Sequence, residues 1–162
     1  MKFKPIYLLY VILLIPFLYR LWGNKNPESL EWEKLEVQSL DGQFVDISDY
    51  KGKKVVMNFW ATWCGPCLAE MPSMEEARRQ LGEDYVFVLI SDEPLEKIRG
   101  FKASKPDYGF EFLQLRQSIN SQGIRSIPQT YIINSYGEIV DDISGMTDWA
   151  RAARIESLRA VE

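Results

Sequence analysis

Two nearly unbroken apolar runs dominate the hydrophobic pattern of this chain of 162 residues. Lys54–Trp60 (KVVMNFW) and Tyr85–Ser91 (YVFVLIS) are typical of strands buried on both faces of a parallel sheet. Pro66–Leu81 lies between them and is predicted to be a helix that Pro72 kinks. Because strands and helices continue to alternate along the chain, the pattern predicts an α/β domain with a mixed central sheet flanked by helices.

Shorter segments complete the predicted domain. Leu40-Asp41-Gly42 is an Asp-Gly hairpin signal between two short strands, Lys34–Ser39 and Gln43–Ile47. A proline at the first position and apolar residues at helical spacing predict a helix over Pro94–Lys102. The remaining predicted elements are strands at Phe110–Leu115, Thr130–Asn134 and Glu138–Ile143, and helices at Arg116–Gln122 and Thr147–Leu158.

An apolar run of another kind precedes this domain. Pro5–Tyr19 is uncharged and follows two lysines, and counting from Phe3 through Trp22 gives 20 residues, enough to span a hydrocarbon core of about 30 Å. We therefore predict that residues 1–23 are a signal anchor forming one transmembrane helix, 24–32 a polar linker and 33–162 the folded domain, facing the periplasm or the cell exterior. The alternative, a cleaved signal peptide, requires a small-residue cleavage site that residues 19–24 lack.

Composition and charge remove several classes of function. The chain has a net charge of −4, and its first 23 residues hold three basic and no acidic side chains, so the remainder is distinctly acidic and nucleic-acid binding is not expected. The chain has no His, which excludes His-ligated metals and Ser-His or Cys-His catalysis. Two cysteines cannot complete a four-thiolate metal site within one chain.

The two cysteines stand where disulfide exchange is favoured. Trp63-Cys64-Gly65-Pro66-Cys67 follows the first buried strand and opens the predicted helix. Unpaired N–H groups and the helix dipole favour a thiolate at Cys64, which is predicted to be the exposed attacking sulfur, while Cys67 one turn later resolves the mixed disulfide. Half of a zinc site and a purely structural disulfide are the alternatives, and a loop this short gives a structural crosslink little entropic benefit.

The segment Phe59–Cys67 (FWATWCGPC) resembles the active site of the thioredoxin superfamily. Glu70-Met71-Pro72, the N-terminal hairpin and Gly123–Ile133 (GIRSIPQTYII) narrow the resemblance to TlpA/ResA-like membrane-anchored thiol–disulfide oxidoreductases, over roughly residues 33–150. The resemblance implies a thioredoxin fold and a redox-active Cys64–Cys67 disulfide that needs no cofactor and no metal. It also implies a cis peptide bond at Ile127-Pro128, although most X-Pro bonds are trans.

Further site residues follow from the same resemblance. Thioredoxin has a buried Asp where this chain has Asn58, which cannot take up a proton, and Glu70 is predicted to relay protons to and from Cys67 from one turn further along the helix. Glu75 and Glu76 are predicted to be surface charges. Family members commonly carry Thr or Glu where this chain has Gln129. The surface offered to a client is expected to include Trp63, Gly65, Pro66, Ile127 and Pro128.

The expected activity is reduction of disulfides in exported proteins, for example during cytochrome c maturation. Gly-Pro between the cysteines resembles reducing thioredoxin, and the resemblance suggests an oxidised client protein as substrate and a CcdA/DsbD-type membrane thiol transporter as electron donor. One alternative is a thioredoxin-fold binding module or Cu(I) metallochaperone. Another is a peroxiredoxin-like peroxidase, although Thr62 lies two residues before Cys64 where a Thr-x-x-Cys setting requires three.

Overall fold

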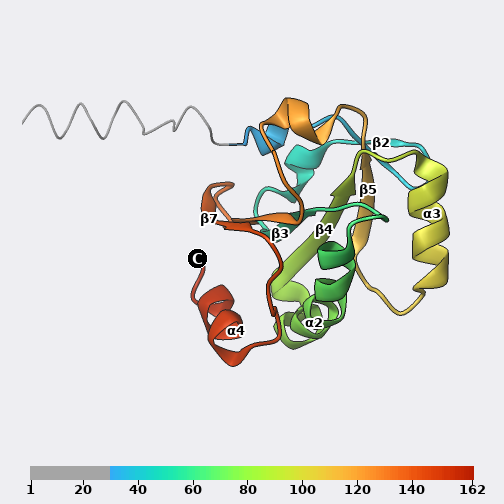
Figure 1. Ribbon diagram of the computed structural model, residues 1–162. Helices are drawn as coiled ribbons and strands as arrows, with labels where there is room; N and C mark the ends of the chain where they lie inside the picture. The colour runs from blue at the N-terminus through green and yellow to red at the C-terminus, as the bar shows by residue number, and fades with distance from the viewer. Residues whose placement is uncertain (1–29) are drawn as a thin grey trace, which may run out of the picture. The chain divides into compact units, whose positions relative to one another are not determined.

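A single mixed sheet of seven strands organises residues 30–162, the part of the chain that the computed structural model describes (Figure 1). The strand order is β2-β1-β5-β4-β3-β6-β7, in which β3, β4 and β5 are parallel and the other pairings are antiparallel. The strands are β1 (Val37–Ser39), β2 (Phe44–Val45), β3 (Lys54–Phe59), β4 (Tyr85–Ser91), β5 (Glu111–Leu115), β6 (Gln129–Ile133) and β7 (Ile139–Ser144).

The three α-helices within residues 30–162 share one hydrophobic core. Helix α2 (Gly65–Leu81) connects β3 to β4 and α3 (Leu95–Ser104) connects β4 to β5, so both crossovers advance in the same direction across the sheet. Because parallel crossovers are right-handed, both helices are expected on the same face. Their buried residues indeed belong to one cluster, which also contains residues of α4 (Ala152–Arg159). Figure 1 shows α2 and α4 below the sheet.

Alternation along β3 divides its side chains between the two faces. Val56, and Trp60 directly after the strand, belong to the cluster between the sheet and the helices, and Val55 and Met57, which point the opposite way, are also fully buried. The second face is covered by short 3₁₀ turns, seen in blue, cyan and orange above the sheet in Figure 1. These turns are η1 (Trp32–Lys34), η2 (Ile47–Tyr50) and η4 (Ile119–Gln122).

The prediction of an α/β domain with a mixed central sheet flanked by helices is confirmed, and several element boundaries change. Strand β4 has the predicted bounds, and α2 continues through Pro72 to Leu81. The hairpin strands are shorter than predicted, and the outermost predicted residues, Lys34 and Ile47, lie in η1 and η2. The predicted helix over Arg116–Gln122 is the single turn η4. The last helix begins at Ala152 instead of Thr147.

The predicted anchor, residues 1–23, and residues 24–29 of the predicted linker lie outside the described residues. Within residues 30–162, no helix combines the length and apolar character needed to cross a bilayer.

Candidate functional site

The cysteine pair lies at the N-terminus of α2, at the edge of the sheet where β3 ends. Cys64 is the N-cap residue with an extended backbone, and its Sγ accepts a hydrogen bond from the Cys67 N–H at 3.2 Å. Gly65 and Pro66 form the first helical positions, where a proline costs no hydrogen bond because those N–H groups have no partner within the helix. The two cysteines are joined by a disulfide, and their Cα atoms are 5.3 Å apart.

The prediction that Cys64 is exposed is wrong for this oxidised state. Cys64 is only 4% exposed and Cys67 only 1%, because the Cys64 side chain turns inward to its partner sulfur and to the Cys67 N–H. The exposed surface around the pair comes from its neighbours: Trp63 is 71% exposed, and Gly65 and Pro66 are also exposed. The indole of Trp63 is therefore the large exposed side chain beside the buried sulfurs.

The Ile127-Pro128 peptide bond is cis, as the resemblance implied. Strand β6 pairs antiparallel with β3, with Phe59 opposite Gln129, so the start of β6 lies at the sheet edge that carries the cysteine loop. The Pro128 carbonyl accepts a hydrogen bond from the Gly145 N–H at 2.8 Å, which ties this loop to the end of β7.

A depression of about 400 Å³ adjoins the cysteine loop. One wall is Trp63, and the other is formed by η4 and the residues that lead from it to the cis-proline. The depression therefore joins two of the predicted client-contact residues, Trp63 and Ile127. Its other lining residues are Asp92, Ile119, Asn120, Ile124, Arg125 and Ser126.

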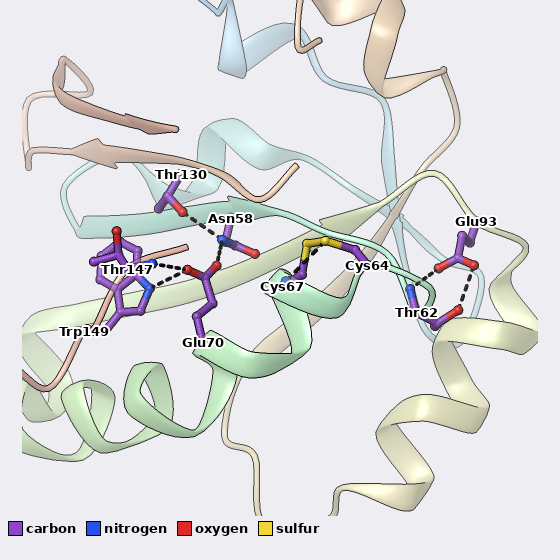
Figure 2. The surroundings of a disulfide bond; sticks show 9 residues. All are labelled: Asn58, Thr62, Cys64, Cys67, Glu70, Glu93, Thr130, Thr147 and Trp149. Atoms are coloured by element: carbon purple, nitrogen blue, oxygen red, sulfur yellow. Dashed lines mark hydrogen bonds between the residues drawn. A yellow bond between two sulfur atoms is a disulfide. The ribbon is translucent and has the colours of Figure 1, made fainter. Parts of the chain in front are cut away.

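Glu70 is buried beside this centre, one turn beyond Cys67 on α2 (Figure 2). Its Oε1 accepts a hydrogen bond from Asn58 Nδ2 at 2.9 Å, and its Oε2 accepts from the Thr147 N–H at 3.0 Å and from Trp149 Nε1 at 3.2 Å. The same Asn58 nitrogen donates to Thr130 Oγ1 at 2.8 Å. In Figure 2 the Asn58 side chain lies between the Glu70 carboxylate and the disulfide.

The environment of Glu70 favours its protonated form. Burial raises the pKa of the carboxyl because it withdraws the negative charge from water. The hydrogen bonds from Thr147, Trp149 and Asn58 favour the charged form and offset this only in part. A carboxyl with a raised pKa is suited to accept and release protons, so the placement agrees with the predicted relay, and the relay itself stays a prediction.

Several residues of the site carried no signal in the sequence. Thr147 and Trp149 follow β7 and are 77 and 79 residues from the carboxylate that they contact. Their contacts also explain why α4 begins later than predicted. The Trp149 N–H donates to Ser73 Oγ at 3.2 Å, so this segment is bonded to α2 and the last helix starts after it.

Glu75 was predicted to be a surface charge, and this is wrong. The residue is only 4% exposed, and its carboxylate accepts hydrogen bonds from Arg78, Arg79 and the Gly109 N–H. The segment before β5 packs over this part of α2 and thereby buries it. Glu76 is exposed, as predicted.

The chain is similar to known thiol–disulfide proteins. Residues 23–153 match the protein-family model described as Redoxin. The thioredoxin-like protein YneN of Bacillus subtilis is 34% identical over 132 residues, which cover 76% of this chain and 77% of YneN. The thiol-disulfide oxidoreductase ResA of Halalkalibacterium halodurans is 34% identical over 119 residues, covering 69% of this chain and 66% of ResA, just under two thirds of that protein.

Solved structures share the fold. The crystal structure of the pneumococcal exposed lipoprotein thioredoxin Etrx1, from Streptococcus pneumoniae, superposes with a TM-score of 0.58 at 30% identity. The match covers 75% of this chain and 97% of Etrx1.

Proposed function

The chain belongs to the redoxin family and is a TlpA/ResA-like thiol–disulfide oxidoreductase of the thioredoxin superfamily, and from this premise we propose that it reduces disulfides in exported proteins. The observation that carries the proposal is the pair of cysteines at the start of α2, with the cis Ile127-Pro128 bond at the same edge of the sheet. The disulfide lies at the same edge of the sheet as the start of β6, which supports this proposal.

The exchange proceeds in two steps. The Cys64 thiolate attacks one sulfur of the client disulfide, forming a mixed disulfide and releasing the other client sulfur as a thiolate. The Cys67 thiolate then attacks Cys64 Sγ, which releases the second client sulfur and leaves the Cys64–Cys67 disulfide. Two electrons pass from the protein's dithiol to the client, and each client thiolate takes up a proton. The Cys67 N–H, already directed at Cys64 Sγ, stabilises the first thiolate.

Glu70 takes the proton of Cys67 in this scheme. The attack by Cys67 requires its thiol to lose a proton in a buried place, and the chain has no His to accept it. Glu70 is the carboxyl one turn away on the same helix, with Asn58 between it and the disulfide. Support comes from the raised pKa of Glu70, which makes it a better base than an exposed carboxylate.

The location and the partners belong to the same proposal. The lysine-flanked apolar run at residues 1–23 serves as the membrane anchor, and the domain acts outside the cytosol. The pneumococcal relative, described as an exposed lipoprotein, supports an extracytoplasmic site. Electrons then have to cross the membrane, for which a CcdA/DsbD-type thiol transporter is the proposed donor. Cysteines of apocytochrome c are the proposed example of a client.

The test is to trap the client on Cys67→Ala in cells. Without the resolving thiol, Cys64 retains its client as a mixed disulfide. Affinity purification from carbonate-washed membranes should yield the full-length chain carrying exported proteins that a thiol reagent releases. Cys64→Ala/Cys67→Ala is the matched control and should carry none.

Three outcomes would contradict parts of the proposal. Absence of any thiol-sensitive adduct would exclude partner reduction, and a shortened chain in the soluble fraction would exclude the anchor.

In vitro, the full chain should reduce insulin with dithiothreitol as donor, and Cys64→Ser should lose this turnover. Tight Cu(I) binding without turnover would favour a metallochaperone instead.

A further inference from the structure

Two consecutive acidic residues directly after β4 hold the loops on either side of the client depression. Glu93 is buried, and its carboxylate accepts hydrogen bonds from both polar groups of Thr62: the backbone N–H at 2.5 Å and the hydroxyl at 2.8 Å (Figure 2). Thr62 lies two residues before Cys64 and directly before Trp63. Glu93 therefore fixes the loop that presents the exposed indole.

Asp92 holds the opposite wall of the depression. Its Oδ2 accepts a hydrogen bond from the Ile119 N–H at 2.9 Å, at the first residue of η4. The chain then runs from η4 to Ile127, and the depression is lined by Ile119, Asn120 and residues 124–127 of this stretch. Neighbouring carboxylates thus hold the two walls, whose sequence positions are more than fifty residues apart.

The turn that carries the two acids is itself fixed to the sheet. The Glu93 N–H donates to Ser91 Oγ at 3.3 Å, and the Glu93 carbonyl accepts from Gln114 Nε2 on β5 at 2.9 Å. Lys97 Nζ lies 3.6 Å from Glu93 Oε1 and compensates part of its buried charge. The sheet therefore holds the two acids in place, and both loops are hydrogen-bonded to them.

We propose that Asp92 and Glu93 are positioning residues that set the spacing of the groove between Trp63 and Ile127 and so determine the affinity for protein disulfides. This inference rests on the proposed function. The occupant is an extended stretch of an oxidised client, because the groove begins at Trp63, next to the attacking cysteine. Hydrogen bonds to a carboxylate are stronger than those between neutral groups, and removing the acceptor leaves partly buried donors without a partner.

The experiment compares a protein disulfide with a small one, using the full chain. For Asp92→Ala and Glu93→Ala we expect KM for insulin to rise about tenfold while kcat changes less than about twofold, because the groove and not the thiol chemistry is altered. The rate toward bis(2-hydroxyethyl) disulfide, which is too small to span both walls, should also stay within about twofold. Loss of folded protein would instead lower both activities together.

The conservative variant separates hydrogen bonding from charge. In Glu93→Gln, the amide oxygen can accept from the Thr62 N–H while the amide nitrogen donates to the Thr62 hydroxyl. This variant should therefore keep KM within about threefold of the wild type. Glu96→Ala removes an exposed acid of α3 without touching either wall and is the control for net charge.

The outcomes distinguish a variant that fails to fold, an incorrect inference and an incorrect proposed function. Should Glu93→Ala not fold, Asp92→Ala decides the matter, since Asp92 is exposed and its loss leaves the core intact. An unchanged insulin KM in Asp92→Ala overturns the inference, as does a Glu93→Gln variant as impaired as Glu93→Ala. A wild-type chain that reduces the small disulfide but never insulin would overturn the proposed function itself.

Discussion

Glu70 is buried, and its carboxylate accepts hydrogen bonds from three nitrogen donors. Among the described residues, no basic side chain forms an ion pair with it. Its pKa is raised above the ordinary value of 4.5, so the folded protein binds this proton more tightly than the unfolded chain does. The stability that protonated Glu70 contributes is complete below pH 4.5. It is lost as the pH rises through the pKa of the folded state.

Replacing Glu70 by Gln should remove this titration. We expect the alkylation rate of Cys67 in the reduced protein to lose a pH-dependent step above pH 4.5 that the wild type shows. The free energy of unfolding of the wild type should also fall relative to Glu70→Gln as the pH rises through that step. Glu76→Gln, at an exposed position of the same helix, is the control. Identical alkylation profiles for Glu70→Gln and the wild type would leave Glu70 a structural role only.

For single residues, the sequence predicted those features of the site that depend only on nearby residues in the chain. The cysteine pair is recognisable because spacing and helix start are local properties. The donors to Glu70 were not predicted, since Thr147 and Trp149 reach it only through the tertiary fold. The burial of Glu75 was missed for the same reason, because its cover comes from the segment around Gly109.

Among the secondary-structure elements, the β6–β7 pair explains the residue that departs from the family pattern. Gln129 lies opposite Ser144 in the register and is buried. Its amide nitrogen donates to Asp142, and its amide oxygen accepts from the Ser144 hydroxyl at 2.5 Å. The side chain thus links the two strands.

The variant Gln129→Glu should destabilise this pair. It loses the donor to Asp142 and sets a second carboxylate against it, so we expect about 1–3 kcal/mol less unfolding free energy at pH 7. Urea unfolding at pH 7 measures this difference. The double variant Gln129→Glu/Asp142→Asn is expected to recover most of the loss. An unaltered midpoint at pH 7 would show that the cross-strand bond contributes nothing.

Element boundaries were predictable where apolar content alone decides them. Strand β4 is a continuous apolar run and its bounds were predicted correctly. The hairpin strands and the start of α4 were not, because turns η1 and η2 and the contacts of Trp149 with α2 decide where those elements begin and end.

For the molecule as a whole, the relative stability of the oxidised and the reduced protein decides whether it reduces or oxidises its clients. The difference in unfolding free energy between the oxidised and the reduced protein fixes how far its reduction potential departs from that of the unfolded dithiol. A strongly stabilised thiolate favours the reduced state and makes a dithiol an oxidant. Both cysteines are buried in the oxidised state, and burial opposes the stabilisation that the start of α2 gives a thiolate. Limited stabilisation of the thiolate agrees with a reductase.

We therefore expect the oxidised chain to be the more stable form. Urea unfolding of the two forms should differ by about 1–3 kcal/mol, and about 1.4 kcal/mol corresponds to 30 mV of reducing power. Equilibration with glutathione buffers gives the potential independently. A reduced form more stable than the oxidised one would identify an oxidant and contradict the proposed direction.

The overall architecture was predictable, and the completion of the site was not. Alternating strands and helices imply the mixed sheet, and crossover handedness implies helices on one face. The centre, however, is closed by the turn after β4 and by the segment after β7, whose contacts depend on how distant loops meet.

The hydrogen bond between Glu70 and Trp149 has a consequence for biosynthesis. Glu70 leaves the ribosome 79 residues before Trp149, at a time when the cysteines are already synthesised. A chain emerges N-terminus first, so the dithiol exists for several seconds with its neighbouring carboxyl still in water. The nascent chain therefore carries two ordinary thiols, and the specialised redox centre arises only when the final segment docks.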